Sequence, residues 1–154
     1  MARKVPLNYI LLAIFTACEA YTISCITRVY SPKEVAIAAC LTAAMTVGLS
    51  LYACYKKSED MTMLGSLLFT TTAVVMVSVV LATVFRSKYL ELAIAGFCVI
   101  LWGLWIVYDT QLIVANKEGA YSVDDYIIAA MNLYIDITQM FLEVLRLVGT
   151  ASGD

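Results

Sequence analysis

Two stretches of the sequence, residues 35–55 and 61–85, contain no charged side chain at all. A helix needs about 20 mainly apolar residues to cross a bilayer core of about 30 Å, and both stretches are long enough. Three more stretches are nearly as apolar and equally long: residues 5–29, 90–116 and 126–148. None of the five alternates polar and apolar residues with the period of two that membrane barrel strands show. The sequence therefore predicts an all-α, polytopic transmembrane helix bundle with five spans, which forms a single transmembrane domain (1–154).

The low charge content of the chain argues against a soluble globular, disordered or coiled-coil protein. Only 14% of the 154 residues are Asp, Glu, Lys or Arg, whereas an ordinary soluble domain has about 25%. So few charges cannot cover the surface of a soluble domain of this size. The net charge of −2 and the absence of a basic patch argue against a nucleic-acid partner. We expect an integral, multi-pass membrane protein that is surrounded by the lipid bilayer.

The sequence carries no signature of a soluble enzyme. It has no GxGxxG, P-loop, HExxH or GxSxG motif. Because it has no histidine, the chain cannot build a Ser-His-Asp or Cys-His site by itself. Tyr108-Asp109 is similar to one motif of the intramembrane aspartyl proteases, but their second motif, Gly-x-Gly-Asp, is absent. We therefore expect a protein that is not an enzyme and that has no cofactor.

Small residues indicate where helices could pack closely. In the second stretch they recur every four positions: Ala36, Cys40, Ala44 and Gly48. Such a ridge lets two membrane helices approach each other, so we expect a packing surface there and around Gly96 and Gly103. The five cysteines are odd in number, lack CxxC spacing and lie inside predicted spans. We expect them to be small packing residues rather than disulfides or metal ligands.

Four acids interrupt the predicted spans: Glu19, Asp109, Asp136 and Glu143. Arg146 is the one base among them, and the chain has no histidine. A charged side chain near the middle of a bilayer costs at least about 2.5–3.5 kcal/mol on insertion scales, and it usually has a function. Four acids with one basic partner cannot all stay ionised in a dry bundle. Some must be protonated, face water or bind a cation.

The fifth stretch carries a stripe of polar residues. Its members lie at relative positions 0, 4, 7, 11 and 14: Asn132, Asp136, Gln139, Glu143 and Arg146. At about 100° per residue, they fall within about 40° of one line along the helix. An amphipathic helix lying on the membrane surface would also show a stripe, but it would carry an excess of Lys and Arg. Glu143 and Arg146 are spaced for an ion pair, whereas Asp136 has no such local partner.

Asp109 and Asp136 are predicted to lie at similar depths in the membrane. Asp109 lies about 10 Å before the end of the fourth stretch, and Asp136 lies about 15 Å after the start of the fifth. The short connection at 117–125 makes these stretches antiparallel neighbours, so the two aspartates can approach each other. Carboxylates in contact would share a proton and titrate as a pair. The alternative is two acids that are satisfied separately, each by its own surroundings.

Five short motifs, spread over nearly the whole chain, carry a resemblance to a known family. They are Pro6-Leu7-Asn8-Tyr9-Ile10-Leu11-Leu12 with Phe15-Thr16, Tyr108-Asp109-Thr110-Gln111-Leu112, Asp125-Tyr126-Ile127, Leu133-Tyr134-Ile135-Asp136-Ile137 and Leu145-Arg146-Leu147-Val148-Gly149. Their order and spacing resemble the Lifeguard branch of the Bax inhibitor-1 family, also called the transmembrane Bax inhibitor motif family. The combination of YDTQL with LYxDI is specific to that family.

The resemblance implies a seven-helix fold of which this chain holds the third to seventh helices. Family members are linked to calcium leak from stores and to suppression of cell death, and a pH-sensitive aspartate pair controls a calcium pathway. By motif, that pair is Asp109 and Asp136. The resemblance favours the endoplasmic reticulum or Golgi over the plasma membrane. It also implies a basic residue on the absent second helix, so we expect missing N-terminal helices or a partner, such as a cell-death regulator, to complete the bundle.

Our leading hypothesis is a pH-gated cation leak pathway in which Asp109 and Asp136 hold Ca²⁺ transiently as the permeant ion. Low pH would protonate the pair and close the path, and higher pH would favour ion entry. Ca²⁺ takes six to eight oxygen ligands, so water must supply most of them. One alternative is a non-conducting membrane regulator of cell death that acts through helix contacts. Another is a proton-coupled carrier, although the sequence shows no inverted repeat.

Other polar residues are secondary candidates for the same pathway. They are Glu19, Asn132, Gln139, Glu143 and Arg146. Glu19 belongs to a weaker stripe with Thr16 and Thr22, at a spacing of three residues. Threonines at such positions more often bond the backbone of their own helix than line a site.

Overall fold

A computed structural model describes residues 6–55, 61–85, 88–114 and 125–152. These residues form helices and no strand. The helices are α1 (Leu7–Thr27), α2 (Pro32–Tyr55), α3 (Met61–Phe85), α4 (Lys88–Val114) and α5 (Tyr126–Ser152). Each is long and apolar enough to cross a membrane. The predicted all-α, polytopic fold is therefore confirmed, and the chain is a multi-pass membrane protein.

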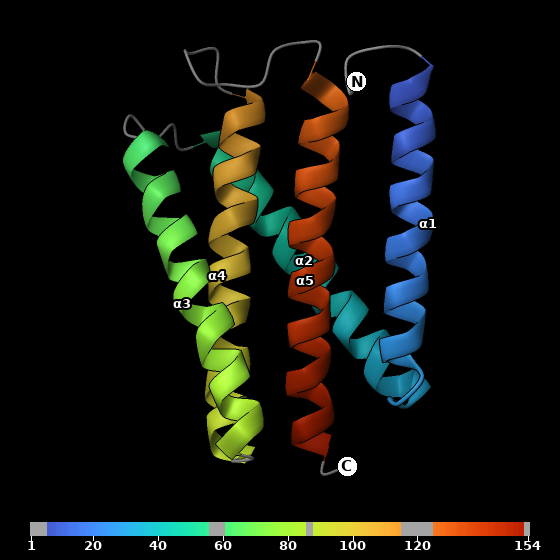
Figure 1. Cartoon of the computed structure of the whole chain (residues 1–154), viewed down its shortest axis with the longest axis vertical. Coiled ribbons are helices and arrows are strands. Elements are labelled where there is room, and N and C mark those ends of the chain that lie inside the picture. Colours follow the sequence, from blue (N-terminus) through green and yellow to red (C-terminus); the bar gives the residue numbers. More distant parts are fainter. Residues whose placement is uncertain (1–5, 56–60, 86–87, 115–124, 153–154) are drawn as a thin grey trace.

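The helices run alternately up and down, so the start of α1 and the end of α5 lie at opposite ends of the bundle (Figure 1). The most extensive packing joins α4 and α5, and α2 packs against both of them. The outer helices have fewer neighbours, since α1 packs mainly on α5 and α3 mainly on α4. The bundle thus has a central α4–α5 pair, with α2 crossing obliquely behind it in Figure 1.

The tightest packing lies where α2, α4 and α5 meet. Ile106, Met140 and Leu145 are fully buried there, together with Ala38 of α2. Lipid is as apolar as these side chains, so close packing and polar contacts hold such helices together rather than the removal of apolar surface from water. The α4–α5 pair is therefore the rigid centre from which the polar side chains are positioned.

The small-residue ridge of α2 does not contribute to this packing. Its residues are all exposed: Ala36, Cys40, Ala44 and Gly48. The buried residues of α2 lie on another face and include Ala38 and Thr42. The prediction that this ridge packs against another helix of the chain is therefore wrong. Residue spacing alone does not tell which face of a helix meets a neighbour.

The glycines predicted on α4 differ from each other. Gly103 is buried, and a Cβ there would lie 3.2 Å from Leu49 Cδ1, so this glycine does mark a close contact. Gly96 has nothing within 4 Å of that position. Of the cysteines, Cys98 is buried as expected for a packing residue, whereas the other four are exposed. The packing prediction is therefore wrong for Cys18, Cys25, Cys40 and Cys54.

A capping box begins α2 three residues earlier than the sequence predicted. The Ser31 backbone N–H donates to Glu34 Oε2 at 2.8 Å, and the Glu34 N–H donates to Ser31 Oγ at 3.4 Å. Pro32 occupies the first helical position, where its missing N–H costs nothing. Nearby, the Tyr30 ring lies so close to Gly149 that a Cβ there would be 2.6 Å from Cε1. The α1–α2 corner is thereby attached to the end of α5.

Candidate functional site

Asp109 of α4 and Asp136 of α5 lie together in the interior of the bundle. They are 4% and 5% exposed, although both are acids in apolar helices. Their carboxyl groups are hydrogen-bonded to each other. A carboxylate can only accept, so this bond requires a proton on one of the two groups. The antiparallel packing of α4 and α5 therefore brings the two acids together into one site.

A cavity of about 260 Å³ lies beside the pair, between α3, α4 and α5. Its lining residues are Thr72, Trp102, Trp105, Asp109, Asn132, Ile135 and Asp136. We call it the aspartate cavity. It has room for several water molecules, each of which takes about 30 Å³ in the liquid. Within the described part of the chain, the buried Asp136 Oδ2 has no hydrogen-bond partner. An ion or water in the cavity would meet an acceptor that the helices themselves leave unsatisfied.

The helical repeat explains which side chains reach the cavity. Trp105 and Asp109 are four residues apart on α4, and Asn132 and Asp136 are four apart on α5, so each pair shares one helix face. Trp105 is also fixed from the side of α3, because its indole Nε1–H donates to Thr72 Oγ1 at 2.9 Å. Sequence reasoning missed Thr72, Trp102 and Trp105. The chain has two tryptophans, and both line this cavity. Their scarcity was the one feature of the sequence that could have marked them.

The polar stripe of α5 divides into two parts. Asn132 and Asp136 line the aspartate cavity, whereas Gln139 is half-buried and is not among its lining residues. Farther along, Arg146 Nη1 lies 3.5 Å from Glu143 Oε2 and forms the ion pair that their spacing predicts. The surface-helix alternative is wrong, because α5 packs against α1, α2 and α4.

The secondary candidate on α1 lies away from this site. Glu19 is half-buried and is not among the residues that line the aspartate cavity. Its neighbours in the weaker stripe bond their own helix: Thr16 Oγ1 donates to the Leu12 carbonyl at 2.9 Å, and Thr22 Oγ1 donates to the Cys18 carbonyl at 3.0 Å. The structure therefore does not bring Glu19 together with the aspartates.

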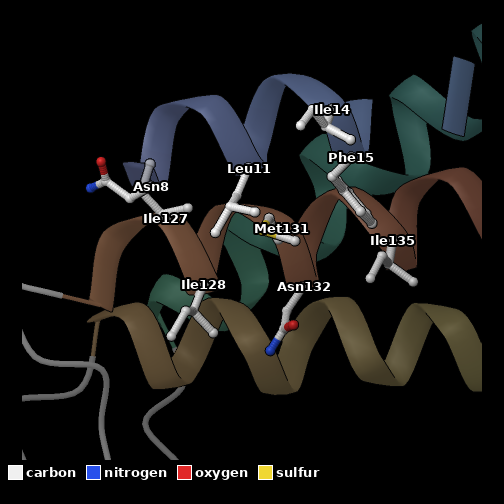
Figure 2. A pocket seen from close by; sticks show the side chains of 9 residues that line it. All are labelled: Asn8, Leu11, Ile14, Phe15, Ile127, Ile128, Met131, Asn132 and Ile135. Carbon is white, nitrogen blue, oxygen red and sulfur yellow. The ribbon is translucent and has the colours of Figure 1, made fainter. Parts of the chain in front are cut away.

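A second cavity of about 410 Å³ lies between α1 and α5. Figure 2 shows the residues that line it: Asn8, Leu11, Ile14, Phe15, Ile127, Ile128, Met131, Asn132 and Ile135. Asn8, one of these lining residues, joins α1 to α5 through two hydrogen bonds, from Asn8 Nδ2 to the Tyr126 hydroxyl and from that hydroxyl to the Tyr9 hydroxyl, each at 3.1 Å. Asn132 and Ile135 line both cavities, so the two spaces adjoin at these α5 side chains.

The donor set of the aspartate cavity does not form a resident metal site. Among the described residues, no cluster of three or more His, Cys, Asp or Glu could hold a metal ion. Two carboxyl groups supply fewer oxygens than Ca²⁺ takes. Water would have to supply most of the ligands of a Ca²⁺ ion at these two carboxyl groups.

Comparison with known proteins places this chain in a family. The family model described as "Inhibitor of apoptosis-promoting Bax1" matches residues 1–153. The chain belongs to the Bax inhibitor-1 family. The predicted resemblance is thus confirmed, and the match includes Asp109, Asp136 and every other residue of the aspartate cavity. No solved structure matches the chain significantly.

The curated relatives of this Bax inhibitor-1 family member include Lifeguard proteins of animals and plants. The chain is 34% identical over 152 residues to protein lifeguard 3 of Mus musculus, covering 96% of the chain and 49% of the relative. It is 35% identical over 152 residues to protein LIFEGUARD 4 of Arabidopsis thaliana, covering 97% and 60%. A "Golgi anti-apoptotic protein" of vaccinia virus (strain Lister) is 30% identical over 146 residues, covering 95% and 60%. The chain thus spans about half to three fifths of these relatives' lengths.

Proposed function

We propose that this chain forms part of a pH-sensitive cation leak pathway through a cell membrane, gated by Asp109 and Asp136, with Ca²⁺ as the permeant ion. The observation that supports the proposal is the contact between two buried carboxyl groups beside a cavity. Structural acids inside membrane proteins usually pair with a base, as Glu143 does with Arg146. An acid paired with another acid instead creates a site whose charge depends on pH.

The gate works through the repulsion that follows loss of the shared proton. Two unit charges about 4 Å apart repel by about 4 kcal/mol at an effective dielectric constant of 20. That energy corresponds to a factor of about a thousand in an equilibrium constant. Deprotonation at higher pH therefore separates α4 from α5 locally or draws a cation to the two carboxylates. At lower pH the shared proton returns, and the path closes.

In the cell, such a leak would regulate intracellular calcium and cell death from an internal membrane. The matching family model is described as an inhibitor of apoptosis-promoting Bax1, and one relative is named as a Golgi anti-apoptotic protein. These names support a role in suppressing cell death at the endoplasmic reticulum or Golgi. Because the relatives are longer than this chain, we propose that further helices or a cell-death regulator complete the pathway.

The test is calcium flux from loaded liposomes that contain the chain, at mildly acidic and mildly alkaline pH. We expect Asp109→Asn and Asp136→Asn each to abolish the difference between the two pH values, because an amide cannot release the proton. Glu19→Gln is the matched control, since it neutralises another membrane acid outside the aspartate cavity. Flux that still depends on pH in both Asn variants would exclude the aspartate gate.

The second candidate function is a membrane regulator of cell death that conducts no ion and acts through helix contacts. The exposed ridge of α2 favours it, because a Cβ at Gly48 would have no neighbour within 4 Å and Ala44 is exposed beside it. Protection from cell death would then be lost in Gly48→Leu and kept in Asp136→Asn. The opposite result would favour the leak pathway.

A further inference from the structure

On the side of α3, a single side chain lines the aspartate cavity. α4 and α5 each supply three of the lining residues, whereas α3 supplies Thr72 alone. α3 packs mainly on α4, and the other described helices leave much of its surface uncovered: Leu67, Phe69, Val74, Met76 and Val77 are each more than 60% exposed. Among the three helices that line the cavity, α3 therefore contributes the fewest lining residues.

The contact that holds this wall is a directed chain of hydrogen bonds. Trp105 Nε1–H donates to Thr72 Oγ1 at 2.9 Å, and the Thr72 hydroxyl donates to the Leu68 carbonyl at 2.8 Å. A threonine hydroxyl has one hydrogen to donate and lone pairs to accept, so both bonds form together without competition. In lipid the indole N–H would otherwise be left without an acceptor.

A second contact lies two helical turns away on the same face of α3. A Cβ at Gly65 would lie 2.6 Å from the Tyr108 hydroxyl oxygen, so glycine is what lets α3 approach α4 here. Tyr108 in turn meets Trp105 edge-on, with ring centroids 5.7 Å apart. Gly65, Leu68 and Thr72 thus form a narrow seam on α3, and Leu68 is its buried apolar member, at 2% exposure.

We infer that Thr72 and Trp105 are positioning residues that hold α3 as a detachable wall over the aspartate cavity. When their bond breaks, α3 moves away from α4, and the cavity, which is already partly open, widens toward the lipid and the membrane edge. The titratable groups that face this bond are Asp109 and Tyr108 from α4 and Asp136 from α5, and α3 has none. The wall is a property of the helix packing. Only its effect on ion flux rests on the proposed function.

The experiment uses the chain's own tryptophans, because Trp102 and Trp105 are its only two and both line the cavity. The full chain is placed in liposomes, and quenching of tryptophan fluorescence by acrylamide and by brominated lipid is measured. Thr72→Val removes the hydroxyl and keeps the shape of the side chain. One hydrogen bond between membrane helices is worth about 0.6 kcal/mol, so we expect the open population to rise about threefold and quenching to rise measurably with it.

Two variants keep the result interpretable. Thr70→Val is the control, since Thr70 is exposed on the same helix and its hydroxyl bonds only the Ser66 carbonyl, at 2.9 Å. Thr72→Ser retains the hydroxyl and should restore wild-type quenching. Equal quenching in Thr72→Val and wild type would overturn the inference, and so would an equal rise in Thr70→Val or no rescue by serine.

Flux measurements separate this inference from the leak pathway. If both hold, calcium flux at acidic pH rises in Thr72→Val and stays at the wild-type level in Thr70→Val. If quenching rises in Thr72→Val while flux stays independent of both aspartates, the wall is supported and the proposed function fails. If flux depends on the aspartates while quenching is unchanged, the proposed function holds and the detachable wall is excluded.

Discussion

The central pair α4–α5 and the outer helices α1 and α3 are all apolar enough to span a membrane, yet they use their polar residues differently. On both kinds of helix, hydroxyl groups bond the backbone one turn earlier, as Thr16 of α1 does to Leu12 and Thr138 of α5 does to Tyr134, so the difference lies in the acids. On the central pair, Asp109 and Asp136 bond each other across the helix interface. Since lipid accepts apolar side chains everywhere, polar groups that require a partner on another helix are what mark the interior.

Burial differs in the same way. Ile106 and Met140 of the central pair are fully buried, whereas Ile14 of α1 and Phe69 of α3 are 57% and 72% exposed. These large side chains are similarly apolar, so hydropathy does not separate the two regions. The same type of substitution should therefore cost much more in the centre than on the outer helices, which allows matched pairs of variants to test the comparison.

The largest difference is expected between two methionines. Met140 on α5 is fully buried and Met76 on α3 is 65% exposed. Truncation of a buried methionine to alanine costs about 2–5 kcal/mol, because it removes packing contacts and leaves a cavity. We expect Met140→Ala to lower the free energy of unfolding in mixed micelles by that amount and Met76→Ala to change it by less than about 0.5 kcal/mol. Similar losses in both variants would break the distinction between centre and outer helices.

Two glycines should show the next largest difference. A Cβ at Gly149 would lie 2.6 and 2.9 Å from two ring carbons of Tyr30, whereas Gly48 has nothing within 4 Å. Gly149→Ala should therefore cost about 1–3 kcal/mol through overpacking. Gly48→Ala should be neutral or stabilising by up to about 1 kcal/mol, because alanine favours the helix. Unfolding titrations of both variants test this, and a loss in Gly48→Ala would mean that the ridge is covered.

A pair of tyrosines tests the junction between α1 and the centre. Tyr126→Phe removes the acceptor of Asn8, which is 1% exposed, and the bond to Tyr9. We expect a loss of about 1–2 kcal/mol, since a buried amide loses its partner. Tyr21→Phe, at a 73% exposed position of α1, is the control and should have no measurable effect. Thermal unfolding followed by circular dichroism measures both, and an unchanged midpoint in Tyr126→Phe would show that α1 is held in another way.

The smallest effect is expected at the ion pair of α5. The side chains of Arg146 and Glu143 are 37% and 18% exposed, and their atoms approach to 3.5 Å. A partly exposed pair of this kind contributes less than about 1 kcal/mol. Arg146→Gln should lower stability by no more than that, compared with Arg28→Gln at an exposed position beyond the end of α1. A loss above about 2 kcal/mol would place this pair among the buried polar contacts of the centre.

The sequence was sufficient to predict the helices and the meeting of the two aspartates. Uncharged length and depth from a helix end depend only on the local chain, and the short link after α4 makes α5 its antiparallel neighbour. The contribution of α3 could not be predicted in the same way. Thr70, Thr71 and Thr72 are consecutive and chemically identical, and each bonds the carbonyl four residues earlier. Only the packing of α3 on α4 decides that Thr72 is the one that reaches Trp105.

The start of α2 differed from the prediction, although the sequence contained a pattern that indicates it. The Ser31-x-x-Glu34 pattern is a capping box, so the start of α2 at Pro32 was readable from the sequence. The direction of the ridge on α2 was not, because small residues suit a helix contact and a lipid-facing surface equally well. What the sequence leaves open is therefore the choice of neighbours rather than the helices themselves.

The central position of α5 has a consequence for how the protein is made. Among the described helices, the one that contacts α1, α2 and α4 is the last to be synthesised. Until it enters the bilayer, α1 lacks its main neighbour, and Asp109 lacks the Asp136 carboxyl group that lies beside it in the aspartate cavity. The first four helices therefore form an incomplete assembly until α5 joins them, so the packing of the whole bundle depends on the helix that is made last.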